Sequence, residues 1–311
     1  MSTQILLWSG FAVLITVMIT LDLGVFNKKS HAVSFREALT WTLVWVALAL
    51  AFNAGILHYL GPTKALEFLT GYLIEESLSV DNLFVFILIF SYFQVSRTYQ
   101  PKILKWGIIG ALVMRALFIF IGIELFERFH WMIYLFGGLL VVTGIKMAFG
   151  GEEKIEPEKN LLVRLTRKFV PITKRIYGDR FFIRRKGVLA ATPLLLTLLV
   201  VESSDVIFAI DSIPAILAVT RDPFIVYTSN VFAIMGLRSL FYLLSSVMEM
   251  FAYLKLGVSF ILAFVGAKML LSSIYHIPIY FSLGVIVGAL AISIITSITF
   301  SAKQQPTSKR K

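Results

Sequence analysis

The chain contains nine apolar stretches of about twenty residues, and this pattern limits its fold more than any other feature. A helix of about twenty apolar residues crosses the ~30 Å hydrocarbon core of a bilayer. With 58% hydrophobic residues and a mean hydropathy of +0.85, the chain is too apolar for one soluble domain. We therefore expect an all-α polytopic membrane protein with spans at 7–26, 41–60, 68–92, 102–124, 131–149, 188–218, 224–247, 253–272 and 278–299.

The basic residues predict how these spans are oriented. If the N-terminus lies outside, 22 of the 29 Lys and Arg residues fall in cytoplasmic segments, and the opposite face receives Lys64, Arg128 and Arg221. Cytoplasmic loops of membrane proteins carry such an excess of Lys and Arg. The bases lie between apolar runs and not on one basic face, so nucleic acid is not an expected partner in spite of the net charge of +11.

One long polar segment interrupts the apolar pattern at residues 150–187. It holds eleven bases and five acids, with apolar residues between them, as in LLVRLTRKFVPITKRIY. One interpretation is a cytoplasmic linker whose amphipathic helix rests on anionic headgroups. The other is a gate or an element that docks a partner, and the sequence does not distinguish the two.

Two predicted spans contain several acids each. Tyr72–Phe86 reads YLIEESLSVDNLFVF, and Val201–Ala215 reads VESSDVIFAIDSIPA. An ionised acid at the centre of a membrane helix costs ~2.5–3.5 kcal/mol, so an acid that persists there generally has a function. The two stretches therefore predict one shared functional site inside the membrane.

The chain also contains an internal repeat. Two sets of one acid, one arginine and one lysine have nearly the same spacing: Asp81, Arg115 and Lys146, then Asp205, Arg238 and Lys268. The copies begin an odd number of spans apart, so the second enters the membrane from the opposite side, as in inverted-repeat transporters. The predicted segments are a two-helix segment at 1–67, repeat one at 68–149, the linker at 150–187, repeat two at 188–272, and the last span with a basic cytoplasmic tail at 273–311.

The inverted repeat predicts how the acids are distributed through the membrane. Antiparallel packing of the two acidic spans places Asp81 and Asp205 at a similar depth near the midplane. With a rise of 1.5 Å per residue, Glu75 and Asp211 lie about 9 Å farther toward the outside, and Glu202 lies about 4.5 Å toward the cytoplasm. We expect the acids to form a ladder across the membrane.

The ligand atoms along this ladder favour a hard divalent cation. They are carboxylate, amide and hydroxyl oxygens, whereas the histidines lie near span ends and cysteine is absent. Oxygen ligands suit Mn²⁺, Mg²⁺ or Ca²⁺ better than Zn²⁺ or Cu⁺. Arg115 and Arg238, near mid-span, are expected to be counter-ions or gating partners. The expected metal ligands are Asp81, Asp205, Glu75, Glu202, Asp211 and Asn82.

The acidic stretches resemble the signature pair of the TerC family of integral membrane proteins, which is named for tellurium resistance. The matching text is EESLSVDN, starting at Glu75, and VESSDVIFAIDSIPA, starting at Val201. FLTGYLIE, DPFIVYTSN and YHIPI resemble the Alx branch of this family. The resemblance covers nearly the whole chain. It implies a nine-span protein of the bacterial inner membrane that exports Mn²⁺, with the motif acids as its pathway.

We therefore expect a secondary transporter that exports Mn²⁺, driven by a large metal gradient or by coupling to inward protons, and not an enzyme. Mn²⁺ is its cargo, so no cofactor is expected, and the bilayer is its other partner. The sequence leaves homo-oligomer formation open. Two alternatives are a non-transporting scaffold in stress responses such as tellurite resistance, and an intramembrane aspartyl protease built on Asp81 and Asp205. The protease is disfavoured because neither aspartate lies in a GxGD type of motif and the acids outnumber a catalytic dyad.

Overall fold

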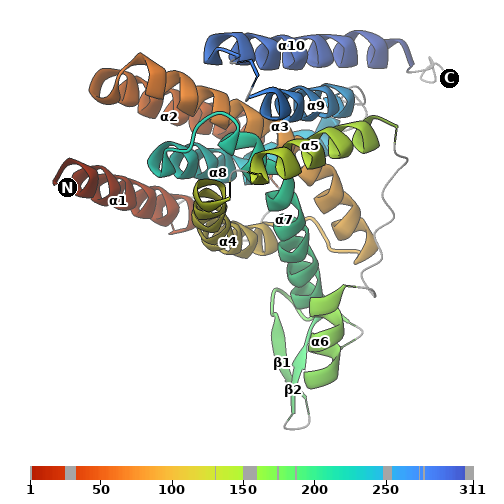
Figure 1. Cartoon of the computed structure of the whole chain (residues 1–311). Coiled ribbons are helices and arrows are strands. Elements are labelled where there is room, and N and C mark those ends of the chain that lie inside the picture. The colour runs from red at the N-terminus through yellow and green to blue at the C-terminus, as the bar shows by residue number, and fades with distance from the viewer. Residues whose placement is uncertain are drawn as a thin grey trace. The chain divides into compact units, whose positions relative to one another are not determined.

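The computed structural model (Figure 1) describes residues 2–24, 33–129, 131–149, 160–173, 175–185, 188–247, 254–272, 274–275 and 277–304. Within these ranges the chain forms ten helices and two short strands. The helices are α1 (Ser2–Gly24), α2 (Phe35–Leu60), α3 (Pro62–Tyr92), α4 (Gln100–Arg128), α5 (Met132–Phe149), α6 (Leu161–Phe169), α7 (Pro193–Leu217), α8 (Pro223–Val247), α9 (Leu254–Leu271) and α10 (Ile279–Gln304). The strands are β1 (Phe182–Arg185) and β2 (Val188–Ala191).

Nine of these helices coincide with the nine apolar stretches. Seven of them, α2, α4, α5 and α7 to α10, are long and apolar enough to cross a membrane. The apolar part of α1 is shorter, at Gln4–Thr20, and α3 contains four acids. A helix suits a bilayer because it satisfies its backbone hydrogen bonds internally. The described chain therefore has the all-α architecture that the sequence predicts.

The expected start of the sixth span at residue 188 is wrong. Residues Val188–Ala191 form β2, which pairs antiparallel with β1, and α7 begins at Pro193. Proline is favoured in the first turn of a helix, and it disfavours helical backbone at the preceding residue. Thr192 therefore stays outside α7, where its hydroxyl donates to the Arg180 carbonyl at 2.7 Å. Periodicity cannot separate a short apolar strand from the helix that follows it.

The chain divides into two compact units that are interleaved in the sequence. Unit 1 contains Met1–Ser34, Phe84–Met114 and Ile155–Ile207, and unit 2 contains Phe35–Leu83, Arg115–Lys154 and Phe208–Lys311. Helices α3, α4 and α7 each contribute residues to both units. The structure therefore groups residues by packing, and the repeat boundaries remain a prediction.

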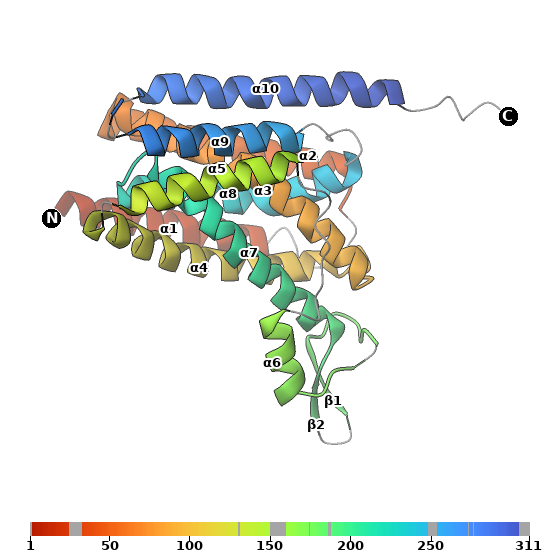
Figure 2. The ribbon, with the colours of Figure 1, turned by 45° about the vertical axis from the view of Figure 1, so that its right-hand side comes forward.

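Helices α5 and α9 pack closely inside unit 2, and Figures 1 and 2 both show them side by side. A Cβ atom added to Gly144 would lie 2.6 Å from the Ser259 carbonyl oxygen. One added to Gly266 would lie 2.7 Å from the Gly137 carbonyl oxygen. Glycine is required at these contacts because the two main chains touch. Small residues allow such close approach between membrane helices.

Unit 1 contains the only strands in the described chain, and they lie beside α6 (Figure 2). A backbone bridge between Ile172 and Ala191 joins the segment after α6 to β2. The Asn160 side chain caps α6 by accepting the backbone N–H groups of Leu162 and Val163. Part of the predicted linker is thus a folded structure.

Candidate functional site

Glu75 of α3 lies at the centre of a polar network inside unit 2. Its carboxylate accepts a hydrogen bond from the Arg115 guanidinium of α4, with which it also forms an ion pair. The Asn230 amide of α8 donates to the other carboxylate oxygen at 2.9 Å. Arg115 also donates to the Ser212 hydroxyl of α7 at 2.8 Å. One motif acid thus joins four helices.

This Glu75 network is almost fully removed from solvent. The exposed fractions are 0% for Glu75, 4% for Arg115, 1% for Ser212 and 0% for Asn230. Two buried atoms of the network, Arg115 Nε and Asn230 Oδ1, have no hydrogen-bond partner among the described residues. Leaving a buried polar atom unpaired costs ~1–3 kcal/mol. A polar ligand that bonded to either atom would remove this cost. Asn230 Oδ1 can accept a hydrogen bond or bind a cation.

Asp211, which precedes Ser212 on α7, contacts a different helix. The Thr143 hydroxyl of α5 donates to its carboxylate at 3.2 Å. Asp211 is half-buried, and Thr143 lies three residues before Lys146 of the first repeat. Neighbouring residues of the second acidic motif therefore contact α4 and α5.

Glu76 faces away from this network, as expected from the ~100° turn between successive helix residues. It accepts a hydrogen bond from the Tyr72 hydroxyl at 2.8 Å. A Cβ atom added to Gly236 of α8 would lie 3.3 Å from the Glu76 carboxylate and 3.7 Å from Trp45 of α2. The two adjacent acids of α3 thus have separate surroundings.

Glu202 of α7 lies against a glycine-lined surface of α4 inside unit 1. A Cβ atom added to Gly110 would lie 2.2 Å from the Glu202 carboxylate oxygens, and one added to Gly107 would lie 4.0 Å away. Glu202 is half-buried and interacts electrostatically with Asp205, which is 7% exposed. No hydrogen bond or ion pair joins the Glu202 side chain to any residue that the structure describes. Its carboxylate is held by shape and not by a cation.

The other expected site residues lie in unit 2. Asn82 is 5% exposed, and Asp81 is half-buried. Because Asp81 and Asp205 belong to different units, their approach near the midplane remains a prediction. Arg238 of α8 is half-buried, and the buried Tyr242 hydroxyl lies near both its positive charge and the negative charge of Glu37 of α2.

The part of the chain that the structure describes does not contain a preassembled cluster of acids. Among the described residues, no group of three His, Cys, Asp or Glu side chains is close enough to hold a metal ion. A cation bound at the Glu75 network would therefore need amide and hydroxyl ligands in addition to carboxylate. Two polar residues that contact motif acids, Asn230 beside Glu75 and Thr143 beside Asp211, were not predicted from the sequence. One signal was present, since Thr228, Ser229 and Asn230 form a polar triplet in an apolar span, and all three are 0% exposed.

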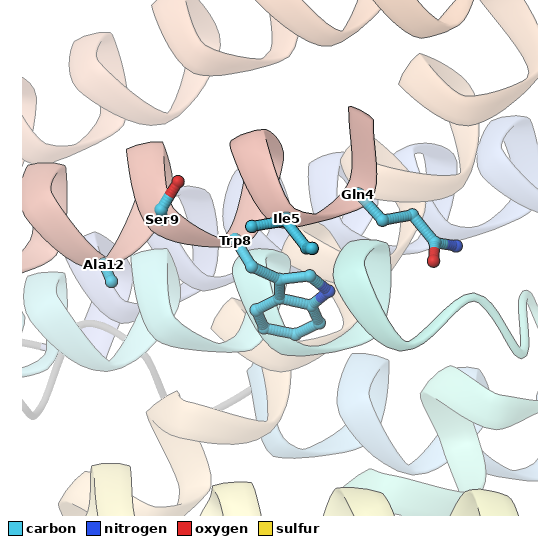
Figure 3. Close-up of a pocket in the computed structure, with 5 residues that line it drawn as sticks. All are labelled: Gln4, Ile5, Trp8, Ser9 and Ala12. Carbon is cyan, nitrogen blue, oxygen red and sulfur yellow. The ribbon is translucent and has the colours of Figure 1, made fainter. Parts of the chain in front are cut away.

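A pocket on α1 differs from the acidic sites in the residues that line it. It is lined by Gln4, Ile5, Trp8, Ser9 and Ala12, which all belong to this helix (Figure 3). The Trp8 indole and the Gln4 amide project from the same helix in this view. The lining contains no acid, so this pocket lacks the chemistry of a cation site.

These features define the class of the molecule, a multi-pass helical membrane protein with acids buried in its helices. The chain belongs to the integral membrane protein TerC family, whose model matches residues 60–305. No solved structure matches the chain significantly.

Relatives of similar length share about half of the residues. The chain is 50% identical over 302 residues to the uncharacterized membrane protein STKORF319 of Myxococcus xanthus, covering 97% of this chain and 94% of the relative. It is 49% identical over 299 residues to Alx of Escherichia coli strain K12, described as a proposed membrane-bound redox modulator, with 93% of both chains covered. A Rickettsia bellii membrane protein is 38% identical over 291 residues, covering 94% of this chain and 96% of the relative.

Proposed function

We propose that this protein is a secondary transporter of the bacterial inner membrane that exports Mn²⁺. The observation that carries the proposal is the Glu75 network, in which a buried motif acid is surrounded by amide and hydroxyl groups. Mn²⁺ binds carboxylate, carbonyl and hydroxyl oxygen. A buried ionisable residue in a membrane helix is a functional candidate by default. The choice of Mn²⁺ over other hard divalent cations rests on the family resemblance.

Arg115 occupies the position of a cation beside Glu75 in this conformation. When Mn²⁺ enters, the guanidinium moves away from the carboxylate, and the ion takes over the neutralisation of its charge. Glu75 then supplies carboxylate oxygen, Asn230 supplies its unpaired Oδ1, and Ser212 supplies hydroxyl oxygen. Because ion and guanidinium compete for one carboxylate, Glu75 remains charge-compensated in both states.

Export requires an energy source besides the membrane potential. Moving two positive charges outward against ~100 mV, inside negative, costs ~4.6 kcal/mol. Exchange of Mn²⁺ for inward-moving protons at the motif acids supplies this energy. In this scheme Asp81 and Asp205 bind the ion near the midplane, Glu202 passes it from the cytoplasm, and Glu75 with Asp211 releases it outward.

The contact between α5 and α9 supports the inverted repeat that this scheme needs. In the repeat alignment that pairs Lys146 with Lys268, every residue of α9 lies 122 positions after its counterpart in α5. Gly144 touches Ser259, and its counterpart Gly266 touches Gly137, the counterpart of Ser259. Such reciprocity is what a two-fold relation between the helices would produce. Inverted repeats of this type transport by rocking one half against the other.

The excess of bases in alternate loops supports a cytoplasmic C-terminus and an external N-terminus.

The redox role in the name of the Escherichia coli relative also bears on function. This chain contains no cysteine, so any redox effect does not pass through its own thiols. A change in cytoplasmic Mn²⁺ would provide an indirect route.

Mn²⁺ efflux from loaded vesicles containing the purified protein tests the proposal. Glu75→Gln should lower the initial rate about 100-fold or more, because it removes the charged ligand of the ion. Glu76→Gln is the matched control, since it makes the same change one residue away on the other face of α3 and should stay within about threefold of wild type. Wild-type efflux by both Glu75→Gln and Asp205→Asn would contradict the assignment.

A non-transporting scaffold is the second candidate, and the ion pair between Glu75 and Arg115 favours it. A buried pair that joins α3 to α4 can serve assembly alone. The scaffold predicts that the double variant Glu75→Gln with Arg115→Met supports tellurite resistance as well as wild type. The transporter predicts that this variant folds but does not move Mn²⁺.

A further inference from the structure

The segment between α5 and α7 contains a folded module that the proposed transport function does not use. We call residues 160–173, 175–185 and 188–192 the α6–hairpin module. The backbone N–H of Thr173 donates to the Ala191 carbonyl, and that of Thr192 donates to the Phe181 carbonyl, both at 2.9 Å. Val163, at 1% exposed, turns inward from α6. The module therefore has its own hydrogen bonds and a buried anchor.

Helix α6 presents two different faces to its surroundings besides the one that holds Val163. At about 100° per residue, four side chains form an apolar face directed away from Val163. They are exposed by 66% (Leu161), 39% (Leu162), 44% (Leu165) and 76% (Phe169). Three exposed bases border this face on one side, namely Arg164, Arg167 and Lys168. An apolar face beside a basic face is typical of helices that lie in a membrane interface.

The hairpin extends the same combination of apolar and basic groups. Phe182, Val188 and Leu189 are each about half exposed, at 45%, 56% and 52%. Residues 160–187 contain nine bases and one acid, Asp179. That acid already forms an ion pair with Lys102 of α4 at 3.0 Å. Within residues 160–187 the bases therefore exceed the acids by eight.

A hydrogen bond ties the start of α6 to a membrane helix. The Asn160 side-chain oxygen, which caps α6, also accepts a hydrogen bond from the Ser203 hydroxyl of α7 at 3.4 Å. Because α7 is one of the helices apolar enough to cross a bilayer, this contact keeps α6 next to a spanning segment.

We propose that α6 docks on anionic phospholipid headgroups. Leu162, Leu165 and Phe169 insert at the boundary of the acyl chains, while the bases on the adjoining face contact lipid phosphates. Positive charge selects an anionic surface, and the large exposed apolar side chains select a lipid over a nucleic acid. The proposal holds whether or not the protein transports Mn²⁺.

The absence of native cysteine permits a direct test on the full-length protein. A nitroxide is attached to Leu165→Cys or, as a matched control about 160° around the helix, to Arg167→Cys. The protein is reconstituted in phosphatidylcholine alone and in an equal mixture of phosphatidylcholine and phosphatidylglycerol. Collision rates with oxygen, which concentrates in lipid, and with a water-soluble nickel complex give the depth of each label.

In the anionic vesicles the ratio of oxygen to nickel collisions should be about threefold or more higher at residue 165 than at residue 167, because only the first label enters the lipid. In phosphatidylcholine alone this difference should shrink. Neutralising Arg164→Gln and Lys168→Gln should lower the ratio of docked to undocked α6 about 30-fold, at ~1 kcal/mol per base. Neutralising Lys309→Gln and Arg310→Gln removes the same charge from the tail and should leave docking unchanged.

Equal nickel access at residues 165 and 167 in the anionic vesicles would overturn the proposal. So would shielding of residue 165 that is the same in both lipid mixtures, because protein would then cover the apolar face. Shielding of residue 165 that appears only when an RNA or an acidic polypeptide is added would show a different partner and would also overturn it.

Discussion

Glu75 and Glu202 are both motif acids inside apolar helices, but their surroundings differ completely. Glu75 has no exposed surface and binds the Arg115 guanidinium and the Asn230 amide. Glu202 is half-buried, and its carboxylate rests on the glycine surface of α4 without a hydrogen bond to any described residue. Glu75 is held by an ion pair, whereas Glu202 is positioned by its packing against the glycines of α4.

This difference separates two ways of keeping a carboxylate in a membrane protein. A buried ion pair is costly to break from either side, because the remaining charge is left uncompensated. A carboxylate on a glycine surface loses little when it moves, so it can bind and release a ligand easily. We expect Glu75 to dominate stability and Glu202 to dominate access to the site.

Loss of Arg115 should give the largest effect. Arg115→Met leaves Glu75 buried without its cation and should destabilise the protein by about 3–5 kcal/mol. Thermal unfolding of the purified full-length protein, followed by tryptophan fluorescence, measures this loss. Adding Glu75→Gln to the same chain removes the stranded charge and should restore a large part of the stability.

Two other variants sharpen this result. Arg238→Met removes the half-buried arginine at the corresponding repeat position and should cost less. Glu202→Gln should leave the unfolding temperature unchanged, because no cation among the described residues pairs with it. If Arg115→Met and Glu75→Gln had additive effects, the two residues would not act as a pair, and the contrast with Glu202 would disappear.

A methyl group at Gly110 should affect transport more than stability. The added Cβ atom of Gly110→Ala would lie 2.2 Å from the Glu202 carboxylate, which must move. Displacement of a reacting group by about 1 Å can cost ~100-fold, and we expect Mn²⁺ efflux to fall at least about tenfold. Stability should change by no more than ~1 kcal/mol, because alanine favours the helix and the long Glu202 side chain can yield.

Gly138→Ala is the matched control for this substitution. Gly138 also lies inside a membrane helix, and nothing lies within 4 Å of an added Cβ atom there. Efflux by this variant should equal that of wild type. Equal efflux by the Gly110 and Gly138 variants would remove the role assigned to the glycine surface.

The ion pair between Lys102 and Asp179 should give the smallest effect. It lies at the surface, with 27% and 55% of the two side chains exposed, so it should contribute only ~0.2–1 kcal/mol. Hydrogen bonding and charge attraction from Lys102 lower the pKa of Asp179 below its ordinary 3.8. The stabilisation is therefore present above that ordinary value and is lost as the pH falls through the lowered pKa.

Carbon NMR of the Asp179 carboxyl group, titrated in the wild type and in Lys102→Met, measures this effect directly. The midpoint should rise in the variant toward the ordinary value for aspartate. An unchanged midpoint would mean that the pair does not form in solution. The exposed pair could then no longer be compared with the buried pair between Glu75 and Arg115.

The existence of the helices follows largely from the sequence, because runs of about twenty apolar residues leave few alternatives. Their ends follow less well, since α2 and α3 each begin six residues before the predicted spans. The hairpin does not follow, since Val188–Ala191 continues into the apolar start of α7 without a break in composition. The proline at residue 193 was the available signal, because it favours a helix start.

The sequence predicts the acids of the site, but it predicts the residues that bind those acids less well. Glu75 stands out because an acid in an apolar helix is costly. Asn230 does not, because a single amide in a membrane helix is common in helix packing and its partner lies 155 residues away in the chain. Which arginine meets which acid depends on how helices rotate about their axes, and spacing along the chain does not fix that rotation.

One amide oxygen, that of Asn160, serves both the first turn of α6 and the hydroxyl next to Glu202. Coupling through such a shared atom is thermodynamically reciprocal: an event that strains one end changes the affinity at the other by the same factor. Lipid composition would then act as an effector, and occupancy of the acidic motif would change how firmly α6 adheres to the membrane.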